Sequence, residues 1–324
     1  MHTSEQLLGK VKNALLNAKF DGQPEELYEP IVYALSLGGK RIRPVMVMMA
    51  CDMFGGDIEL ALNPAIAMEI FHNFTLLHDD IMDMSPIRRG KETVCKKWNA
   101  NVAILSGDTM FALAYKHLIK TKPEVLINIL EIFTQTAIEV CEGQQYDMNY
   151  ETCKKVSIPE YIEMIRLKTS VLIAASLKTG AIIAGADKQD VINIYKFGEY
   201  VGLAFQLQDD ILDIYGKQEI FGKKIGGDII TNKKTYLFLK ALQEAKDDDY
   251  VKLIYYFSST NFDNNEKIKV ITEIYNRLCI KENAIFLKNE FYNKAIDYFN
   301  KISVDSEKKH VLKKYTDQLM QRNF

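Results

Sequence analysis

The sequence predicts an all-α protein, and three observations support this fold class. All seven prolines lie at or before Pro159, so the second half of the chain lacks the residue that most disrupts a helix interior. Long segments carry apolar residues at three- and four-residue intervals, the spacing of one helix face. Alternating strand patterns bounded by Asn-Gly or Asp-Gly turns are absent, and no glycine-rich loop follows an apolar β-branched run, which disfavours Rossmann and P-loop folds. We expect about ten or more helices packed as one large bundle.

Two segments carry the helical pattern most clearly. In residues 65–84, apolar side chains recur at helical spacing from Ile70 to Ile81, and Pro86 provides a stop soon afterwards. Residues 191–215 form the second segment, which ends at Gly216. Because no low-complexity linker interrupts the pattern, we expect residues 1–324 to form a single domain.

The composition indicates a folded protein without a strong charge bias. At 324 residues, 48% hydrophobic and 26% charged, the chain is long enough and apolar enough to bury a large core. A formal net charge of -2 provides no basic field, which argues against nucleic acid as a partner. Any anionic ligand must therefore be bound by a local cluster of basic residues.

The cysteines and the apolar segments bear on location. The five cysteines are scattered and form no CxxC pair, which indicates reduced thiols in a cytoplasmic protein. The N-terminus lacks the pattern of a secretory signal. The most apolar stretch, residues 171–186, is interrupted by Lys178 and is too short for a transmembrane segment.

Two acidic motifs carry the chemistry. Each places three carboxylates within one helical turn of an apolar run: Asp79, Asp80 and Asp83 in LLHDDIMDM, and Asp209, Asp210 and Asp213 in FQLQDDILDI. Such carboxylates repel one another and are costly against apolar surface without a counter-charge. Since neither segment contains a matching Lys or Arg, a divalent cation is the natural partner, and oxygen ligands without Cys indicate Mg²⁺.

A solvated acidic patch is the alternative for either motif alone, but two copies in apolar settings disfavour it. Mg²⁺ usually shares its ligands with substrate phosphates. Two aspartate clusters facing each other would therefore suit a diphosphate, which also needs direct cationic contacts. Three loops with glycine or proline, residues 36–44, 85–91 and 217–234, supply them: Lys40, Arg41 and Arg43; Arg88 and Arg89; and Lys223, Lys224 and Lys233.

The order of these motifs resembles that of the trans-isoprenyl diphosphate synthases. From Gly38 to Thr235 the chain contains GGKRIRP, ExxHxxxLxHDDxxDxxxxRRG, GQxxD, KT, FQxQDDxxD and GKxxGGD followed by KKT. The resemblance implies an isoprenoid synthase-like helical bundle around a central cavity. It also implies a prenyltransferase in which an allylic diphosphate ionises and the double bond of isopentenyl diphosphate attacks the resulting cation. The departing diphosphate then accepts the proton.

The resemblance also implies roles for individual residues. Asp79, Asp80, Asp83 and Asp209 would hold three Mg²⁺ ions on the allylic diphosphate, with Asp210 and Asp213 supporting the second cluster. The allylic diphosphate would contact Arg88, Lys168, Lys223 and Lys233. Isopentenyl diphosphate would contact Lys40, Arg43, His72 and Arg89. Oxygens of Lys168, Thr169 and Gln206 would face the allylic cation, with Gln144 and Asp147 nearby. For His78 and the Gly107-Asp108 pair we expect structural roles.

Product length follows from the residues just before the first aspartate motif. In the family this segment forms the floor of the tunnel for the growing chain. Phe74 stands five residues before Asp79, with Thr75 and Phe71 beside it. A large ring at this position blocks long products, so C5 to C15 allylic substrates are expected to give C15 to C20 products.

Several alternatives stay open from the sequence. One is a synthase of longer polyprenyl chains. Another is a class I terpene cyclase, although the second motif, DDILD, lacks the Asn, Ser or Thr, and Glu pattern of cyclases. A non-catalytic synthase subunit has no reason to keep six carboxylates, and an HD-type phosphohydrolase would need a further histidine metal spacing. The family resemblance also implies a homodimer.

Overall fold

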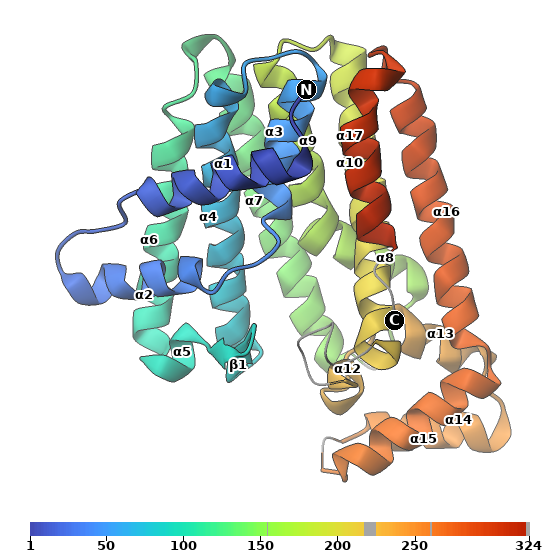
Figure 1. Cartoon of the computed structure of the whole chain (residues 1–324). Helices are drawn as coiled ribbons and strands as arrows, with labels where there is room; N and C mark the ends of the chain where they lie inside the picture. Colours follow the sequence, from blue (N-terminus) through green and yellow to red (C-terminus); the bar gives the residue numbers. More distant parts are fainter. Residues whose placement is uncertain (154, 217–224, 260, 322–324) are drawn as a thin grey trace. The chain divides into compact units, whose positions relative to one another are not determined.

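The computed structural model describes residues 1–153, 155–216, 225–259 and 261–321 (Figure 1). It confirms the all-α prediction, because the described residues form more than ten helices and only one hairpin, whose two strands have two residues each. In chain order the elements are α1 Ser4–Asn17, α2 Glu25–Ser36, α3 Ile42–Met53, α4 Ile58–Met82, β1 Ile87–Arg88, β2 Lys91–Glu92, α5 Val94–Lys97, α6 Ala100–Leu118, α7 Pro123–Thr152, α8 Ile158–Ile165, the π-helix η1 Arg166–Ser170, α9 Val171–Ile183, α10 Lys188–Tyr215, α12 Gly227–Ile230, α13 Tyr236–Glu244, α14 Asp247–Phe257, α15 Asn264–Arg277, α16 Ile280–Asn300 and α17 Ser306–Met320.

The chain divides into two compact units, each of several segments. The first unit comprises Met1–Thr134, Ala175–Tyr195 and Ile302–Tyr315, and the second comprises Gln135–Ala174, Lys196–Lys301 and Thr316–Phe324. That the whole chain forms one domain stays a prediction.

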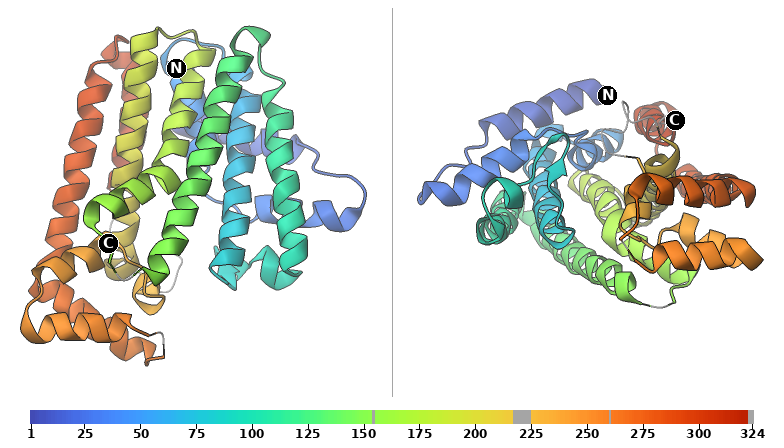
Figure 2. Two further views of the ribbon diagram at one scale, coloured as in Figure 1. Left: turned by 180° about the vertical axis from the view of Figure 1, so that it is seen from behind. Right: turned by 90° about the horizontal axis from the view of Figure 1, so that it is seen from below.

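The core of the first unit is built around α3 and α4. Nearly every residue of α3 is buried, and α4 packs against both α3 and α6. Figures 1 and 2 show α4 and α6 running side by side. Gly180 of α9 approaches α3 so closely that a Cβ would lie 2.1 Å from the Val47 carbonyl oxygen, so only glycine fits there.

Side-chain caps define where the helices of the first unit begin. The Asp57 carboxylate accepts a hydrogen bond from the Glu59 backbone N–H at the start of α4, and Asn99 accepts one from Val102 at the start of α6. The helix expected over residues 65–84 is therefore the C-terminal part of a longer α4. Its end lies next to the hairpin β1–β2, which spans residues 87–92 and overlaps the predicted loop 85–91.

The second unit joins the C-terminal part of α7, helices α8 and η1, most of α10 and the helices from α12 to α16. A capping box between Ser157 and Glu160 begins α8, and the helix predicted over residues 191–215 is observed as α10. Helix α13 packs on α8 and α16, and α15 packs on α12, α14 and α16. The Phe238 and Phe257 rings stack at 3.9 Å between centroids, and this contact packs α13 against α14.

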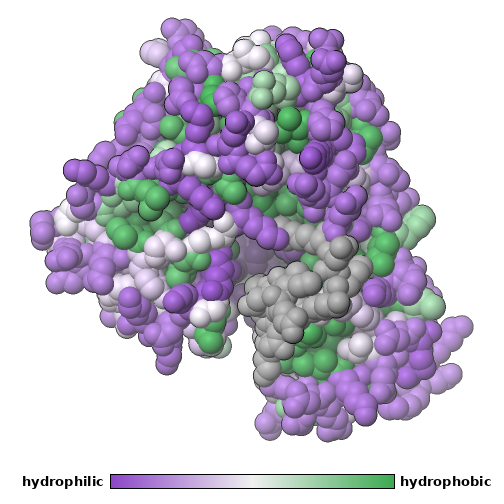
Figure 3. All heavy atoms as spheres, in the orientation of Figure 1, coloured by the Kyte–Doolittle hydropathy of each residue, from purple (hydrophilic) through white to green (hydrophobic). Residues whose placement is uncertain are grey.

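The helices differ in how their apolar residues are placed: α3 and α9 are buried on nearly all sides, whereas α8 is amphipathic. None of the described helices combines the length and hydrophobicity that a bilayer span requires. On the face shown in Figure 3, hydrophilic residues predominate and hydrophobic ones are scattered or in small groups.

Candidate active site

In the first unit, α4 ends in a carboxylate cluster held by an arginine. Asp79 and Asp80 lie in the last turn of α4, and Asp83 is its C-terminal cap. Arg88, on β1, donates from Nε to Asp80 Oδ1 at 2.7 Å and from Nη2 to Asp79 Oδ2 at 3.0 Å. The structure thus brings together one predicted allylic diphosphate ligand and two predicted metal ligands.

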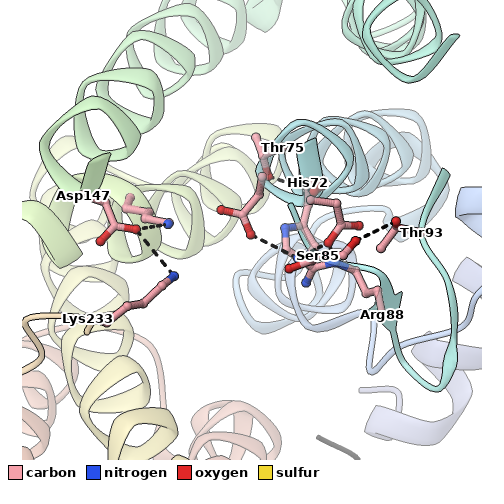
Figure 4. Close-up of polar contacts among 10 residues, drawn as sticks. His72, Thr75, Ser85, Arg88, Thr93, Asp147 and Lys233 are labelled. Carbon is pink, nitrogen blue, oxygen red and sulfur yellow. Dashed lines mark hydrogen bonds and ion pairs between the residues drawn. The ribbon is translucent and has the colours of Figure 1, made fainter. Parts of the chain in front are cut away.

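The hairpin that carries Arg88 is tied to α4 by its own hydrogen bonds. The Ser85 N–H donates to the Asp80 carbonyl at 3.0 Å, and the Thr93 hydroxyl donates to the Ser85 carbonyl at 2.8 Å (Figure 4). These bonds connect both ends of the 85–93 turn. Arg88 is therefore held beside the aspartates by the backbone as well as by charge.

Asp80 is buried, and this changes its acidity. Burial raises the pKa of the Asp80 carboxyl to about 6, although the Arg88 guanidinium acts in the opposite direction. The neighbouring Asp79 and Asp83 carboxylates raise the pKa of Asp80 further. A buried carboxylate with like charges beside it gains from a bound cation.

The predicted isopentenyl diphosphate ligands also lie in the first unit. Arg43 Nη1 lies 3.0 Å from His72 Nε2, and desolvation together with the Arg43 charge lowers the pKa of His72 well below its usual value. His72 is thus neutral at physiological pH, and its Nε2 accepts the hydrogen bond from Arg43. Arg89 donates to the Gly38 carbonyl, which places it against the loop that carries the exposed Lys40.

Arg41 behaves differently from the other basic residues of its loop. Its place in the GGKRIRP motif predicted that Arg41 binds phosphate, but Arg41 is only 8% exposed. Its guanidinium donates to Glu69 and to the Leu35 carbonyl, and Asn73 Nδ2 donates to Glu69 Oε1 at 2.8 Å. Arg41 is therefore a buried structural partner of Glu69, and its placement among the anion-binding residues was wrong.

Aromatic rings surround the predicted chain-length residues. Phe74 stacks on Phe111 of α6 at 5.3 Å between centroids, and Phe71 lies at 5.5 Å from Phe74. Phe133 of α7 meets Phe71 edge-on at 5.1 Å. The Thr75 hydroxyl donates to the His72 carbonyl at 2.8 Å, as Figure 4 shows.

His78 lies beside these rings in a tight contact. A Cβ at Gly107 would lie 2.3 Å from His78 Nε2, so glycine lets α6 approach α4 here. The ring of His78 meets Phe74 edge-on at 4.7 Å. This close packing accords with the structural roles expected for His78 and Gly107.

In the second unit, the aspartates of α10 have separate partners. Asp210 is only 4% exposed; it accepts hydrogen bonds from the Tyr161 hydroxyl and, at 3.0 Å, from Gln206 Nε2. Burial and the nearby Asp228 raise the pKa of Asp210 to about 8. Asp213 instead accepts from the Asp228 N–H at 3.0 Å, which fixes the start of α12.

Lys168 and Thr169 lie in the π-helix η1, a turn that recurs at functional sites. Thr169 Oγ1 donates to Gln206 Oε1 at 2.9 Å. Two glycines allow the other helices to approach this turn: a Cβ at Gly143 would lie 2.3 Å from the Lys168 backbone nitrogen, and one at Gly202 would lie 2.5 Å from the Ser170 Cα.

Asp147 connects two predicted allylic diphosphate ligands. Its Oδ2 lies 2.6 Å from Lys168 Nζ and 3.9 Å from Lys233 Nζ. Figure 4 shows the side chains of Asp147 and Lys233 pointing toward one another. Gln144, one turn earlier on α7, has a buried Nε2 that finds no hydrogen-bond partner within the described residues. Lys223 and Lys224 lie outside the described residues.

These groups fit a magnesium ion through the chemistry of their donors. Within the described residues, no three His, Cys, Asp or Glu side chains converge as a complete metal centre. Mg²⁺ does not require one, because it keeps water and substrate phosphate oxygens among its ligands. The buried carboxylates of Asp80 and Asp210, each with other carboxylates of its own unit nearby, supply hard oxygen donors that a cation would stabilise.

Sequence reasoning missed several residues that organise these groups. Tyr161 gives no signal in sequence, because a tyrosine on a helix is ordinary and its partner lies far along the chain. Glu69 begins the ExxHxxxLxHDD motif, and its place there was a usable signal. Asp228 belongs to the GGD motif that contributed to the resemblance, and its position there was a usable signal. In the structure its N–H donates to Asp213, and its charge raises the pKa of Asp210.

The helical fold, with one aspartate motif in each unit, is that of the isoprenoid synthases. The family model described as polyprenyl synthetase matches residues 24–275. The chain therefore belongs to the polyprenyl synthetase family and is a prenyltransferase.

Three known proteins illustrate the similarity. A geranylgeranyl diphosphate synthase of Sulfolobus acidocaldarius is 36% identical over 299 residues, which are 91% of this chain and 90% of that protein. A crystal structure of a geranylgeranyl pyrophosphate synthase has a TM-score of 0.95 at 41% identity and covers 100% of both chains. The structure of a geranylgeranyl pyrophosphate synthase from Corynebacterium glutamicum, complexed with isoprenyl diphosphate and magnesium, has a TM-score of 0.88 at 25% identity and covers 99% of this chain and 98% of that one.

Proposed function

We propose that the protein condenses isopentenyl diphosphate with an allylic diphosphate and releases a short all-trans prenyl diphosphate, with C20 as the main product. The observation that carries this proposal is the pair of aspartate motifs, each in a unit that also holds cationic side chains suited to phosphate. Arg88 accompanies the first motif, and Lys168 and Lys233 gather at Asp147 in the unit of the second. The names of the similar proteins support the C20 product.

Magnesium is the metal that this proposal includes. Asp79, Asp80, Asp83 and Asp209 would hold it, with Asp210 and Asp213 in support, and three ions would bind with the allylic diphosphate. When bound, Mg²⁺ supplies a Lewis acid that stabilises negative charge on the leaving diphosphate. The magnesium in the Corynebacterium glutamicum structure supports this choice.

The protein's own side chains hold and orient the substrates. Arg88, Lys168 and Lys233, with Lys223 from outside the described residues, would contact the allylic diphosphate as charge-assisted donors. Lys40, Arg43, His72 and Arg89 would contact isopentenyl diphosphate. Neutral His72 is suited to donate a hydrogen bond to phosphate from Nδ1 while its Nε2 remains on Arg43. The Gln206 and Thr169 oxygens would lie toward the developing allylic cation.

Product length is assigned to the aromatic cluster of α4 and α6. The Phe74 ring is stacked between its own helix and Phe111, so it cannot swing aside without losing that contact. A ring fixed in this way would stop chain growth. The C15 end of the range expected from the sequence is less favoured, because the similar proteins are named for the C20 product.

The protein would form a homodimer and work in the cytoplasm. Large apolar side chains remain exposed on α6 and α7, among them Leu105 at 60% and Ile127 at 63%. A homodimer that covers them would remove this apolar surface from water. The five cysteines are free thiols in the structure, in keeping with a reducing cytoplasm.

A requirement for two substrates tests this function against the terpene cyclase alternative. The protein is incubated with farnesyl diphosphate alone and with farnesyl diphosphate plus isopentenyl diphosphate, and the products are separated by chromatography. We expect a longer prenyl diphosphate only in the second mixture. A hydrocarbon or alcohol formed in the first mixture would instead identify a cyclase.

A further inference from the structure

A chain of three hydrogen bonds joins three elements of the second unit. The Tyr161 hydroxyl, from α8, donates to Asp210 Oδ2. Gln206 Nε2, one turn before Asp210 on α10, donates to Asp210 Oδ1 at 3.0 Å. Thr169 Oγ1, from η1, donates to Gln206 Oε1 at 2.9 Å. These hydrogen bonds therefore connect Tyr161 to the KT motif through the second aspartate motif.

The chemistry of each group determines which partner donates and which accepts in these hydrogen bonds. Tyr161 Oη and Gln206 Nε2 lie at the two oxygens of Asp210, and an ionised carboxylate, the form that a bound cation favours, only accepts hydrogen bonds from such donors. Gln206 then presents its NH₂ group to Asp210, and its carbonyl oxygen is left to accept from Thr169. The carboxylate thus sets which end of the Gln206 amide faces Thr169.

Burial makes the Tyr161 hydroxyl important for Asp210. Tyr161 is 2% exposed and Asp210 is 4% exposed, so water is a poor substitute for either partner. Each oxygen of Asp210 already accepts one hydrogen bond from a described side chain. Without the phenol, one buried oxygen would lose its donor, and the carboxylate would be free to turn toward Gln206.

We infer that Tyr161 is a positioning residue that orders the second aspartate motif and the Gln206–Thr169 pair for binding of the metal and the diphosphate. This inference rests on the proposed function, which assigns those groups to the reaction. Tyr161 acts through Asp210 and contacts no substrate itself. Asp210 in turn serves as the support that holds the start of the DDxxD turn, while Asp209 lies about 100° further round the helix.

The test compares Tyr161→Phe with a matched control in the full-length protein. Tyr292→Phe is the control, because Tyr292 also donates to an aspartate, Asp317 Oδ1, at 2.6 Å, between α16 and α17. Each variant loses one oxygen atom. We expect Tyr161→Phe to lower kcat about tenfold or more and to raise the Mg²⁺ concentration for half-maximal rate several-fold, with the KM for isopentenyl diphosphate unchanged. Tyr292→Phe should keep the parental values.

A binding readout separates this inference from the proposed function. Mg²⁺ with inorganic pyrophosphate should raise the Tm of the parent and of Tyr292→Phe, and raise that of Tyr161→Phe by a clearly smaller amount. An equal Tm increase together with parental kcat in Tyr161→Phe would overturn the positioning role while the synthase assignment stands. A parent protein that makes no prenyl diphosphate would overturn both.

A double-mutant cycle with Asp210→Ala tests whether Tyr161 acts through Asp210. Asp210→Ala removes the carboxylate that accepts the hydrogen bond from the phenol. If Tyr161 acts only through Asp210, the losses in kcat from the two single variants should not add in the double variant. Fully additive losses would show that Tyr161 acts by another route.

Discussion

Single residues of the two aspartate motifs differ sharply in their surroundings. Asp79 and Asp80 share the Arg88 guanidinium, whereas both Asp210 oxygens accept from uncharged donors. Burial raises the pKa of Asp80 to about 6 and that of Asp210 to about 8. The same DDxxD spacing thus has different counter-groups in the two motifs. The spacing itself does not distinguish ligands from supporting carboxylates, and only the family resemblance implied that distinction.

Removal of a metal-binding carboxylate should abolish catalysis without unfolding the protein. We expect Asp79→Ala and Asp209→Ala each to lower kcat by orders of magnitude, because the charge on the leaving diphosphate loses its stabilisation. Steady-state assays and thermal melts would measure both effects. Near-normal turnover in either variant would contradict the metal assignment at that position.

The raised pKa of Asp210 predicts how the metal-free protein responds to pH. The folded state binds the Asp210 proton more tightly than the unfolded state does, so this carboxyl favours folding at low pH, and the benefit disappears as pH rises through about 8. Thermal melts in EDTA should show the Tm falling from about pH 4, near the ordinary pKa of 3.8, to about pH 8 and levelling off above it. The fall should be smaller in Asp210→Asn, and an identical pH profile in that variant would rule out this contribution.

Loss of the buried ion pair between Arg41 and Glu69 should lower the stability of the protein strongly. Arg41→Met leaves the Glu69 carboxylate, which is 1% exposed, without its counter-charge, and the cost should be about 3–5 kcal/mol. Lys10→Met removes an exposed ion pair with Glu59 and should cost less than about 1 kcal/mol. Urea unfolding would compare the two. A small effect of Arg41→Met would show that the buried pair is dispensable.

At the scale of secondary-structure elements, α4 holds residues of three parts of the candidate site. Its central part places His72 near Arg43, its aromatic face stacks with α6, and its last turn presents Asp79 and Asp80. The apolar period of the sequence predicted this helix well. The ring partners Phe111 and Phe133 could not be assigned, since periodicity identifies a buried face and not the residues packed against it.

Truncation of the Phe74 ring should lengthen the product. Phe74→Ala removes the ring stacked on Phe111, so chain growth should continue beyond C20. Phe286→Ala, at a ring that is 65% exposed, is the control and should leave the product unchanged. Chromatography of the products would measure chain length. An unaltered distribution in Phe74→Ala would refute the proposed floor of the tunnel.

The π-helix η1 shows where sequence reasoning reached its limit. The segment around Lys168 and Thr169 has the apolar period of an ordinary helix. Its wider turn is accommodated by the close approach of Gly143 from α7 and Gly202 from α10. Both glycines are distant in sequence from η1, so no local pattern could have indicated the π-turn.

At the scale of the whole molecule, fold class and family could be predicted because many residues contribute to them. Helical period, proline placement and the order of the motifs all indicated the same answer, and the match to the polyprenyl synthetase family confirms it. Individual partners depend on a few contacts between distant segments, as for Tyr161 and Asp210. The sequence therefore predicted the class of protein better than the support of its candidate site.

The reaction proposed for this protein is magnesium-dependent condensation to a C20 product. The most direct test incubates the protein with labelled isopentenyl diphosphate and farnesyl diphosphate, in Mg²⁺ and in EDTA, and identifies the labelled products by chromatography. We predict a single main C20 prenyl diphosphate with Mg²⁺ and none with EDTA. Label that stays in isopentenyl diphosphate under both conditions, or equal product in EDTA, would contradict the account.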